Sequence, residues 1–186
     1  NKYGILNSRK RVLLATVPLD TFLTRYIKRG MECNCDTAHL FDYFSFNHSI
    51  YTAEEARDLF IDRVSDEASK YNNVRLNLAV DFFRVQLTTD DYKDKVDKVE
   101  KLIRKSHRIG DNDIEATTLE NIWKESYYSH RYARSFTYAQ QLEEALGKVS
   151  HNYPYTGMYY IQIGAAYYAF KDYEKSISLM HKGLSY

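Results

Sequence analysis

The chain has 186 residues, of which 44% are hydrophobic and 27% are charged. These proportions are typical of folded proteins and exclude wholesale disorder. Two prolines and seven glycines are too few for the many tight turns of a β-sandwich or β-barrel, so the composition favours helices. The 26 Lys and Arg residues balance 25 Asp and Glu residues, for a formal net charge of +1, which gives the whole chain no general attraction for nucleic acids or anionic membranes.

Residues 1–36 are predicted to form an N-terminal segment with one amphipathic helix. Pro18 fits the first turn of this helix and Gly30 fits its end. Between them, apolar residues recur at helical spacing: Leu19, Phe22, Leu23, Tyr26 and Ile27. The stretch SRKRVLLATVPL faintly resembles a signal peptide, but it has no small-residue cleavage site, and a buried segment explains it better. No stretch reaches the roughly 18 apolar residues of a membrane span.

Residues 37–186 are predicted to form an array of helix pairs with a period of about 40 residues. Tyr92, Tyr132 and Tyr173 lie 40 and 41 residues apart, and each follows a short polar junction and opens a helical pattern. The last such pattern predicts a buried stripe of Tyr173, Ile177, Met180 and Leu184. Asp91 and Gly110 fit a helix start and a helix end. The predicted units span about 37–70, 71–108, 111–148 and 155–186.

The first helix of each later unit also has an apolar stripe. The residues of these stripes are Leu76, Ala79, Val80, Phe83 and Leu87, then Ile114, Leu119, Ile122, Trp123 and Tyr127, and finally Tyr160, Ile163, Gly164, Tyr167 and Phe170. Their spacing of three to four residues places each set on one side of a helix. The unit is therefore predicted to be helix, tight turn, helix.

The final unit, YIQIGAAYYAFKDYEKSISLMHKGL, resembles a tetratricopeptide repeat (TPR). The matching positions are Tyr160 for the usual Trp, Ile163 and Gly164 for Leu-Gly, Tyr167 for Tyr, Ser176 and Gly183 for Ala, and Met180 for the aromatic residue. The resemblance implies an all-α fold, a right-handed α-solenoid of antiparallel helix pairs in which small residues let the paired helices approach closely. HEAT-like helix pairs, which share the longer period, are the structural alternative.

The resemblance also implies a non-enzymatic module that binds a protein or peptide on a concave face formed by the first helices. The residues that the register places on this face are Asn77, Arg84, Glu120, Lys124, Tyr128 and Tyr168. Arg84 and Lys124 would hold carboxylates of the peptide. For each of the six, exposure to solvent without a binding role is an equally simple interpretation.

The wider context implied by the resemblance is a bacterial signalling or transcription-regulatory protein in which such an array is joined to an output domain. We expect no direct nucleic-acid binding by this region, no cofactor, and a homo-oligomer through the C-terminal repeat as one arrangement that covers its apolar end. The chain begins at Asn1, so we expect it to be cut from a longer protein. The cytoplasm is the favoured compartment, and the periplasm fits if a targeting segment was removed.

No reaction centre is evident in the sequence. Cys33, Cys35 and His39 have the spacing of half a zinc site, but nothing indicates a second half, so free thiols are the simpler interpretation. The run KDKVDKVEKLIRKSHR alternates cations and carboxylates, which indicates a solvated helix face. Two alternatives to a peptide receptor remain open: an assembly scaffold without a sensing role, and a helical-repeat enzyme with a pocket near His107, His130 or His151.

Overall fold

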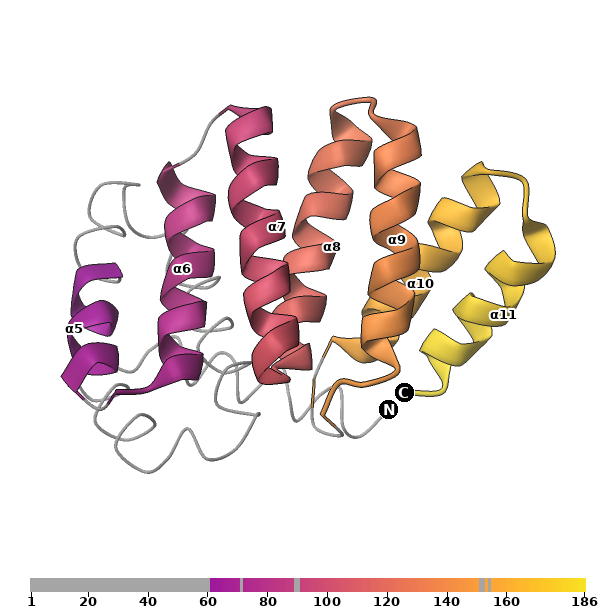
Figure 1. Cartoon of the computed structure of the whole chain (residues 1–186). Coiled ribbons are helices and arrows are strands. Elements are labelled where there is room, and N and C mark those ends of the chain that lie inside the picture. The colour runs from indigo at the N-terminus through magenta and orange to yellow at the C-terminus, as the bar shows by residue number, and fades with distance from the viewer. Residues whose placement is uncertain (1–60, 71, 89–90, 151–152, 154) are drawn as a thin grey trace, which may run out of the picture. The chain divides into compact units, whose positions relative to one another are not determined.

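The computed structural model describes residues 61–70, 72–88, 91–150, 153 and 155–186, and within these ranges the chain is helical without any β-strand. The predicted all-α class is therefore confirmed. The described helices are α5 (Arg63–Lys70), α6 (Val74–Thr88), α7 (Tyr92–Ile109), α8 (Asn112–Tyr128), α9 (Tyr132–Leu146), α10 (Thr156–Ala169) and α11 (Tyr173–Leu184) (Figure 1). The predictions for Pro18, for Cys33, Cys35 and His39, and for His151 lie outside the described residues.

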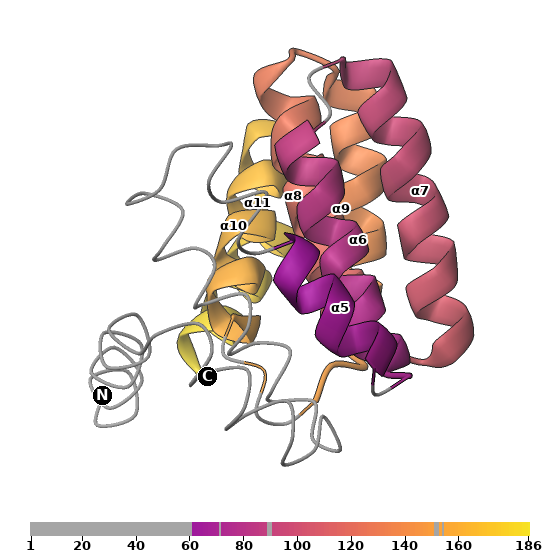
Figure 2. The same ribbon diagram turned by 90° about the vertical axis from the view of Figure 1, so that its left-hand side faces the viewer.

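The chain divides into two compact units, Asn1–Lys105 and Ser106–Tyr186. The first unit contains α5, α6 and most of α7, and α5 packs beside α6 in both views (Figure 1 and Figure 2). The second unit contains the last turn of α7 and helices α8 to α11. Its closest backbone packing is within two antiparallel hairpins, α8 with α9 and α10 with α11 (Figure 1).

Four connections between consecutive helices share one turn geometry. Each contains a single residue in the left-handed region: Asn72 (φ 48°), Gly110 (φ 73°), His130 (φ 58°) and Lys171 (φ 65°). In each turn the next residue donates its amide hydrogen to a carbonyl five residues earlier, at N–O distances of 2.9 to 3.0 Å: Asn73 to Ala68, Asp111 to Ser106, Arg131 to Ser126 and Asp172 to Tyr167. This hydrogen bond closes the preceding helix. The prediction that a helix ends at Gly110 is confirmed.

Four helices begin with an Asn or Asp side chain that accepts a hydrogen bond from the amide three residues later. The pairs are Asn73 with Leu76 (3.0 Å), Asp91 with Asp94 (2.8 Å), Asp111 with Ile114 (3.1 Å) and Asp172 with Lys175 (3.2 Å). Such caps satisfy amides that have no partner inside the helix. Three of these caps directly follow a left-handed residue, so two adjacent residues end one helix and begin the next.

The first helices bury most of the predicted apolar stripes. The confirmed buried residues are Leu76, Ala79, Val80, Phe83, Ile114, Leu119, Ile122, Trp123, Tyr160, Ile163, Gly164 and Tyr167. Tyr127 and Phe170, at the ends of two stripes, are exposed. Within α9, Tyr132 is also exposed, whereas Ala139 is buried.

The predicted buried stripe of α11 is wrong. Tyr173, Ile177 and Leu184 expose 51%, 58% and 72% of their surface, and Met180 is only half-buried. The residues that α11 buries are instead Ser176, Leu179 and Gly183. Where α11 approaches α10 most closely, it has the small residues Ser176 and Gly183.

Glycines set this close approach between α10 and α11. A Cβ atom built on Gly183 would lie 2.5 Å from the carbonyl oxygen of Gly157 and 2.7 Å from Cγ1 of Ile161. A Cβ on Gly164 would lie 2.8 Å from Cγ of Met180 and 3.0 Å from the carbonyl oxygen of Ser176. The prediction that small residues bring the helices of this unit together is confirmed for Gly164 and Gly183.

We predict that Gly183→Ala lowers the free energy of unfolding by about 2 to 3 kcal/mol, because the new methyl group meets backbone atoms that cannot rotate away. The matched control is Gly147→Ala, since Gly147 ends α9 with a φ of −71° and a Cβ atom there would lie 3.3 Å from the carbonyl oxygen of Glu144. Its effect should stay within about 1 kcal/mol. Urea unfolding followed by circular dichroism measures both changes, and equal effects would contradict the assigned close contact.

Candidate functional site

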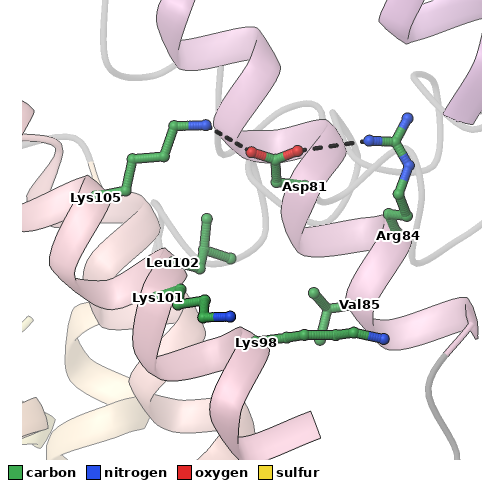
Figure 3. Close-up of a pocket in the computed structure, with 7 residues that line it drawn as sticks. All are labelled: Asp81, Arg84, Val85, Lys98, Lys101, Leu102 and Lys105. Atoms are coloured by element: carbon green, nitrogen blue, oxygen red, sulfur yellow. Dashed lines mark hydrogen bonds and ion pairs between the residues drawn. The ribbon is translucent and has the colours of Figure 1, made fainter. Parts of the chain in front are cut away.

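A groove of about 260 Å³ lies between α6 and α7 in the first unit (Figure 3). Seven residues line it: Asp81, Arg84 and Val85 from α6, and Lys98, Lys101, Leu102 and Lys105 from α7. The spacings of three and four residues place each set on one side of its helix. The groove therefore exists because these two helix sides face one another.

Positive charge dominates the groove, since four of its seven lining residues are cationic and one is acidic. The single carboxylate, Asp81, is shared by two cations. One of its oxygens lies 2.7 Å from the Lys105 ammonium and the other lies 3.6 Å from the Arg84 guanidinium. Figure 3 shows Asp81 between these two side chains. Asp81 therefore holds Arg84 and Lys105 at the groove, and one carboxylate does not neutralise the positive charge of the four cations.

The other two cations of the groove lie farther along α7. Lys98 pairs with Asp94, one turn earlier on the same helix, at 2.7 Å, and its side chain extends toward Val85 of α6 (Figure 3). Among the described residues, Lys101 has no ion-pair partner. Leu102 is buried beside them and Val85 is half-buried. The groove thus combines cationic side chains with an apolar floor, an arrangement suited to an anionic group attached to an apolar one.

Of the cations that line the groove, the sequence predicted a binding role for Arg84 but not for the three lysines. The run from Lys93 to Arg108 was interpreted as a solvated face because its charges alternate. The missed signal is the spacing of Lys98, Lys101 and Lys105, which repeats every three to four residues beside the apolar positions Val99 and Leu102. Such a spacing places the three ammonium groups along one helix side, next to the part of the helix that packs inward.

Asn77 and Arg84, the predicted site residues of the first unit, lie on the same side of α6. Asn77 is half-buried one turn before Asp81, although it does not line the groove. Arg84 is exposed and lines it. The structure brings these two predicted residues to one helix side together with a carboxylate that was not predicted, Asp81.

The other four predicted residues belong to the second unit. On α8, Glu120 is buried and forms an ion pair with Lys124, one turn later. Tyr128 ends α8, is largely exposed, and packs its ring edge-on against Tyr127 at a centroid distance of 5.8 Å. Tyr168 of α10 is also exposed, and its ring contacts that of Tyr173 at 5.3 Å. Lys124 thus already has a carboxylate partner within its own helix.

Glu120 is near a buried polar cluster in the second unit. The Tyr153 hydroxyl lies 2.5 Å from the Thr117 hydroxyl, and the Tyr153 ring packs against Tyr159 at 6.0 Å. Burial raises the pKa values of both phenols, so both remain neutral and serve as hydrogen-bonding groups. Burial also raises the pKa of the Glu120 carboxyl above its usual 4.5, and Lys124 opposes this rise in part.

Of the three histidines named for an enzyme pocket, the structure describes His107 and His130, and each contacts a different side chain. His107 is exposed, with Nδ1 3.2 Å from a carboxylate oxygen of Glu115, and exposed His130 has Nδ1 2.8 Å from the Tyr132 hydroxyl. In the described part of the chain, no group of three or more His, Cys, Asp or Glu side chains is arranged to hold a metal ion. None of the described helices has the length and apolar character needed to cross a bilayer.

Comparison of the chain with protein-family models, curated proteins and solved structures finds no match. The interpretation of the groove therefore depends on its own residues.

We predict that Glu120→Gln changes the pH dependence of stability. A raised pKa means that the folded protein binds this proton more tightly than the unfolded chain. The stability that Glu120 contributes is thus present below pH 4.5 and is lost as the pH rises through the folded-state pKa. Relative to wild type, the Glu120→Gln variant should therefore become more stable as the pH rises through that pKa. Chemical denaturation at several pH values measures the difference, with Asp97→Asn, an exposed carboxylate on α7, as the control. A pH-independent difference for Glu120→Gln would contradict the assignment.

Proposed function

We propose that the chain is a non-enzymatic, TPR-like helical repeat module that binds an acidic peptide segment of a partner protein through the groove between α6 and α7. The observation that carries the proposal is the set of four cations, from two facing helices, around an apolar floor with a single carboxylate. The ligand chemistry that fits is a peptide with Asp or Glu side chains next to an apolar side chain.

Arg84 is central to this recognition. A guanidinium group presents paired N–H donors that match the two oxygens of a carboxylate. Its pairing with Asp81 at 3.6 Å is looser than the 2.7 Å contact between Asp81 and Lys105. A carboxylate bound by Arg84 would lie beside Asp81, which keeps its contact with Lys105.

The lysines of α7 add attraction over a longer range. Lys98 and Lys101 lie on the same side of the helix as Lys105, so a bound peptide meets positive charge along two turns of α7. Leu102 and Val85 offer an apolar contact between these charges. An acidic peptide with an apolar residue would use both features, whereas a small inorganic anion would use only the charges.

The balanced charge of the chain favours a peptide over a nucleic acid. The formal net charge is +1, and proteins that bind nucleic-acid backbones typically need a broad basic surface that contacts many phosphates. A local cluster of four cations suits the few carboxylates of a peptide segment. The helix hairpins and the resemblance of the last unit to a tetratricopeptide repeat support an interaction module of this kind.

The test is fluorescence anisotropy with a labelled Glu-rich peptide that contains a central Leu, against the same peptide with Gln in place of Glu. We predict that Arg84→Gln and Lys101→Gln each weaken binding about two- to fivefold, because each removes a solvent-exposed charge pair. The double variant should weaken it about tenfold, and added salt should weaken the wild type toward the variants.

Lys93→Gln is the matched control, because Lys93 is exposed on the same helix but does not line the groove. Its peptide affinity should equal that of the wild type. Equal binding of the Gln peptide, or an equal loss in Lys93→Gln, would show that the groove does not recognise carboxylates. If the wild type binds no peptide, an assembly scaffold becomes the favoured function. If it binds a single-stranded oligonucleotide more strongly than the peptide, the ligand of the groove is a nucleic acid instead.

A further inference from the structure

The hairpin of α10 and α11 exposes a set of large apolar side chains. Its members each expose between 37% and 72% of their surface: Met158, Ile161 and Tyr168 of α10, and Tyr173, Ile177 and Leu184 of α11. Exposed apolar residues are common singly, but a cluster on two adjacent helices indicates an interaction surface. We call these six residues the hairpin face.

The hairpin face is continuous across the two helices. At one end, the rings of Tyr168 and Tyr173 touch edge-on, with centroids 5.3 Å apart. Toward the other end, Ile161 lies directly against Gly183, the residue before Leu184. Because α10 and α11 are antiparallel, the exposed residues of the two helices run along the hairpin side by side.

The exposed side of α11 points away from α9. Lys175 pairs with Glu143 of α9, and Lys182 lies over the Tyr160 ring, 4.3 Å from its centroid. Residues two apart on an α-helix lie on nearly opposite sides. Tyr173 and Ile177 are each two residues from Lys175, and Leu184 is two residues from Lys182. The apolar stripe of α11 is therefore turned away from the contacts that hold it to the rest of the unit.

The size of the hairpin face fits a specific interface. From their exposed fractions, the six side chains present on the order of 600 Å². This area is at the upper end for a patch on a monomeric protein, and it approaches the roughly 600 to 800 Å² that each partner buries in a specific complex. A second copy of the same face would supply an equal area.

We propose that a second copy of this chain covers the hairpin face, with the two α11 helices packed antiparallel about a two-fold axis. The charges of α11 favour this direction, since its first turn contains Glu174 after the cap Asp172, and its last turn contains His181 and Lys182. Lys175 of the first turn is paired with Glu143 on the other side of the helix. At the edge of the stripe, antiparallel helices therefore place each Glu174 beside the partner's His181, whereas parallel helices would place the two Glu174 carboxylates together. The proposal is independent of the peptide groove.

The two-fold arrangement also fixes which side chains meet. With the axis near Ser178, Tyr173 of one copy packs near the partner's Leu184, and Ile177 packs near its own equivalent. Glu174 and His181 are seven residues apart and thus lie on the same side of α11, at the edge of the apolar stripe. Each Glu174 then lies near the partner's His181. The same surface of each copy is used, as a two-fold interface requires.

Sedimentation equilibrium of the full chain over a range of concentrations tests the proposal. We expect a monomer–dimer equilibrium in the wild type. Ile177→Glu should raise the dimer Kd about tenfold or more, because two carboxylates would meet near the axis in an apolar interface. The matched control is Val74→Glu, since Val74 is 50% exposed in the first turn of α6, and it should keep the wild-type Kd. Circular dichroism checks that both variants keep their helix content.

A charge exchange tests the direction of packing. Glu174→Lys alone should weaken the dimer because it removes the carboxylate that faces the partner's His181. His181→Glu alone should weaken it because two carboxylates would then face each other across the interface. The double variant should restore it, since each Lys at 174 would then face the partner's Glu at 181. A wild type that stays monomeric at every attainable concentration would overturn the proposal, as would a dimer that Ile177→Glu leaves intact. Failure of the double variant to restore the dimer would overturn the antiparallel arrangement.

Discussion

The fold depends on how the chain reverses direction between helices. At four turns, one left-handed residue and the residue after it end one helix and direct the next, and the connecting amide always reaches the carbonyl five residues earlier. Because such turns are so short, α8 packs antiparallel against α9, and α10 packs antiparallel against α11. The turn sets the orientation of the second helix, so it also determines which residues of the two helices face each other and which side of each helix is buried.

Within the α10–α11 hairpin, this constraint explains why apolar side chains are exposed. The short turn brings the two helices so close that Gly157, Gly164 and Gly183 face neighbouring atoms directly. No side chain fits at the closest points, so α11 presents Gly183 and the backbone of Ser176 there. Tyr173, Ile177 and Leu184 lie on another side of the helix and are exposed. The close approach of the two helices therefore accompanies an exposed apolar stripe.

The sequence predicted the parts of the fold that depend on local pattern. The all-α class, the burial of most first-helix stripes and the helix end at Gly110 follow from periodicity and turn residues, which act over a few positions. The buried side of α11 could not be predicted from periodicity. Its apolar stripe and its small-residue stripe are both regular, and only the distance to α10 decides between them. Likewise Arg84 was predicted at a binding surface from its type and register, and it lines the groove. Lys98, Lys101 and Lys105 were not predicted there, because their position at the groove depends on the facing side of α6. In each case the missing information was the spacing between two helices.

The groove between α6 and α7 has a further property that follows from its position in the chain. All its lining residues fall between Asp81 and Lys105, so its geometry is determined by one short stretch of sequence. Sites built from distant segments change whenever either segment or the packing between them changes. Contacts between residues close in sequence cost less chain entropy to form than contacts between distant segments. Exchange of this one helix pair would therefore transfer all the residues that line the groove.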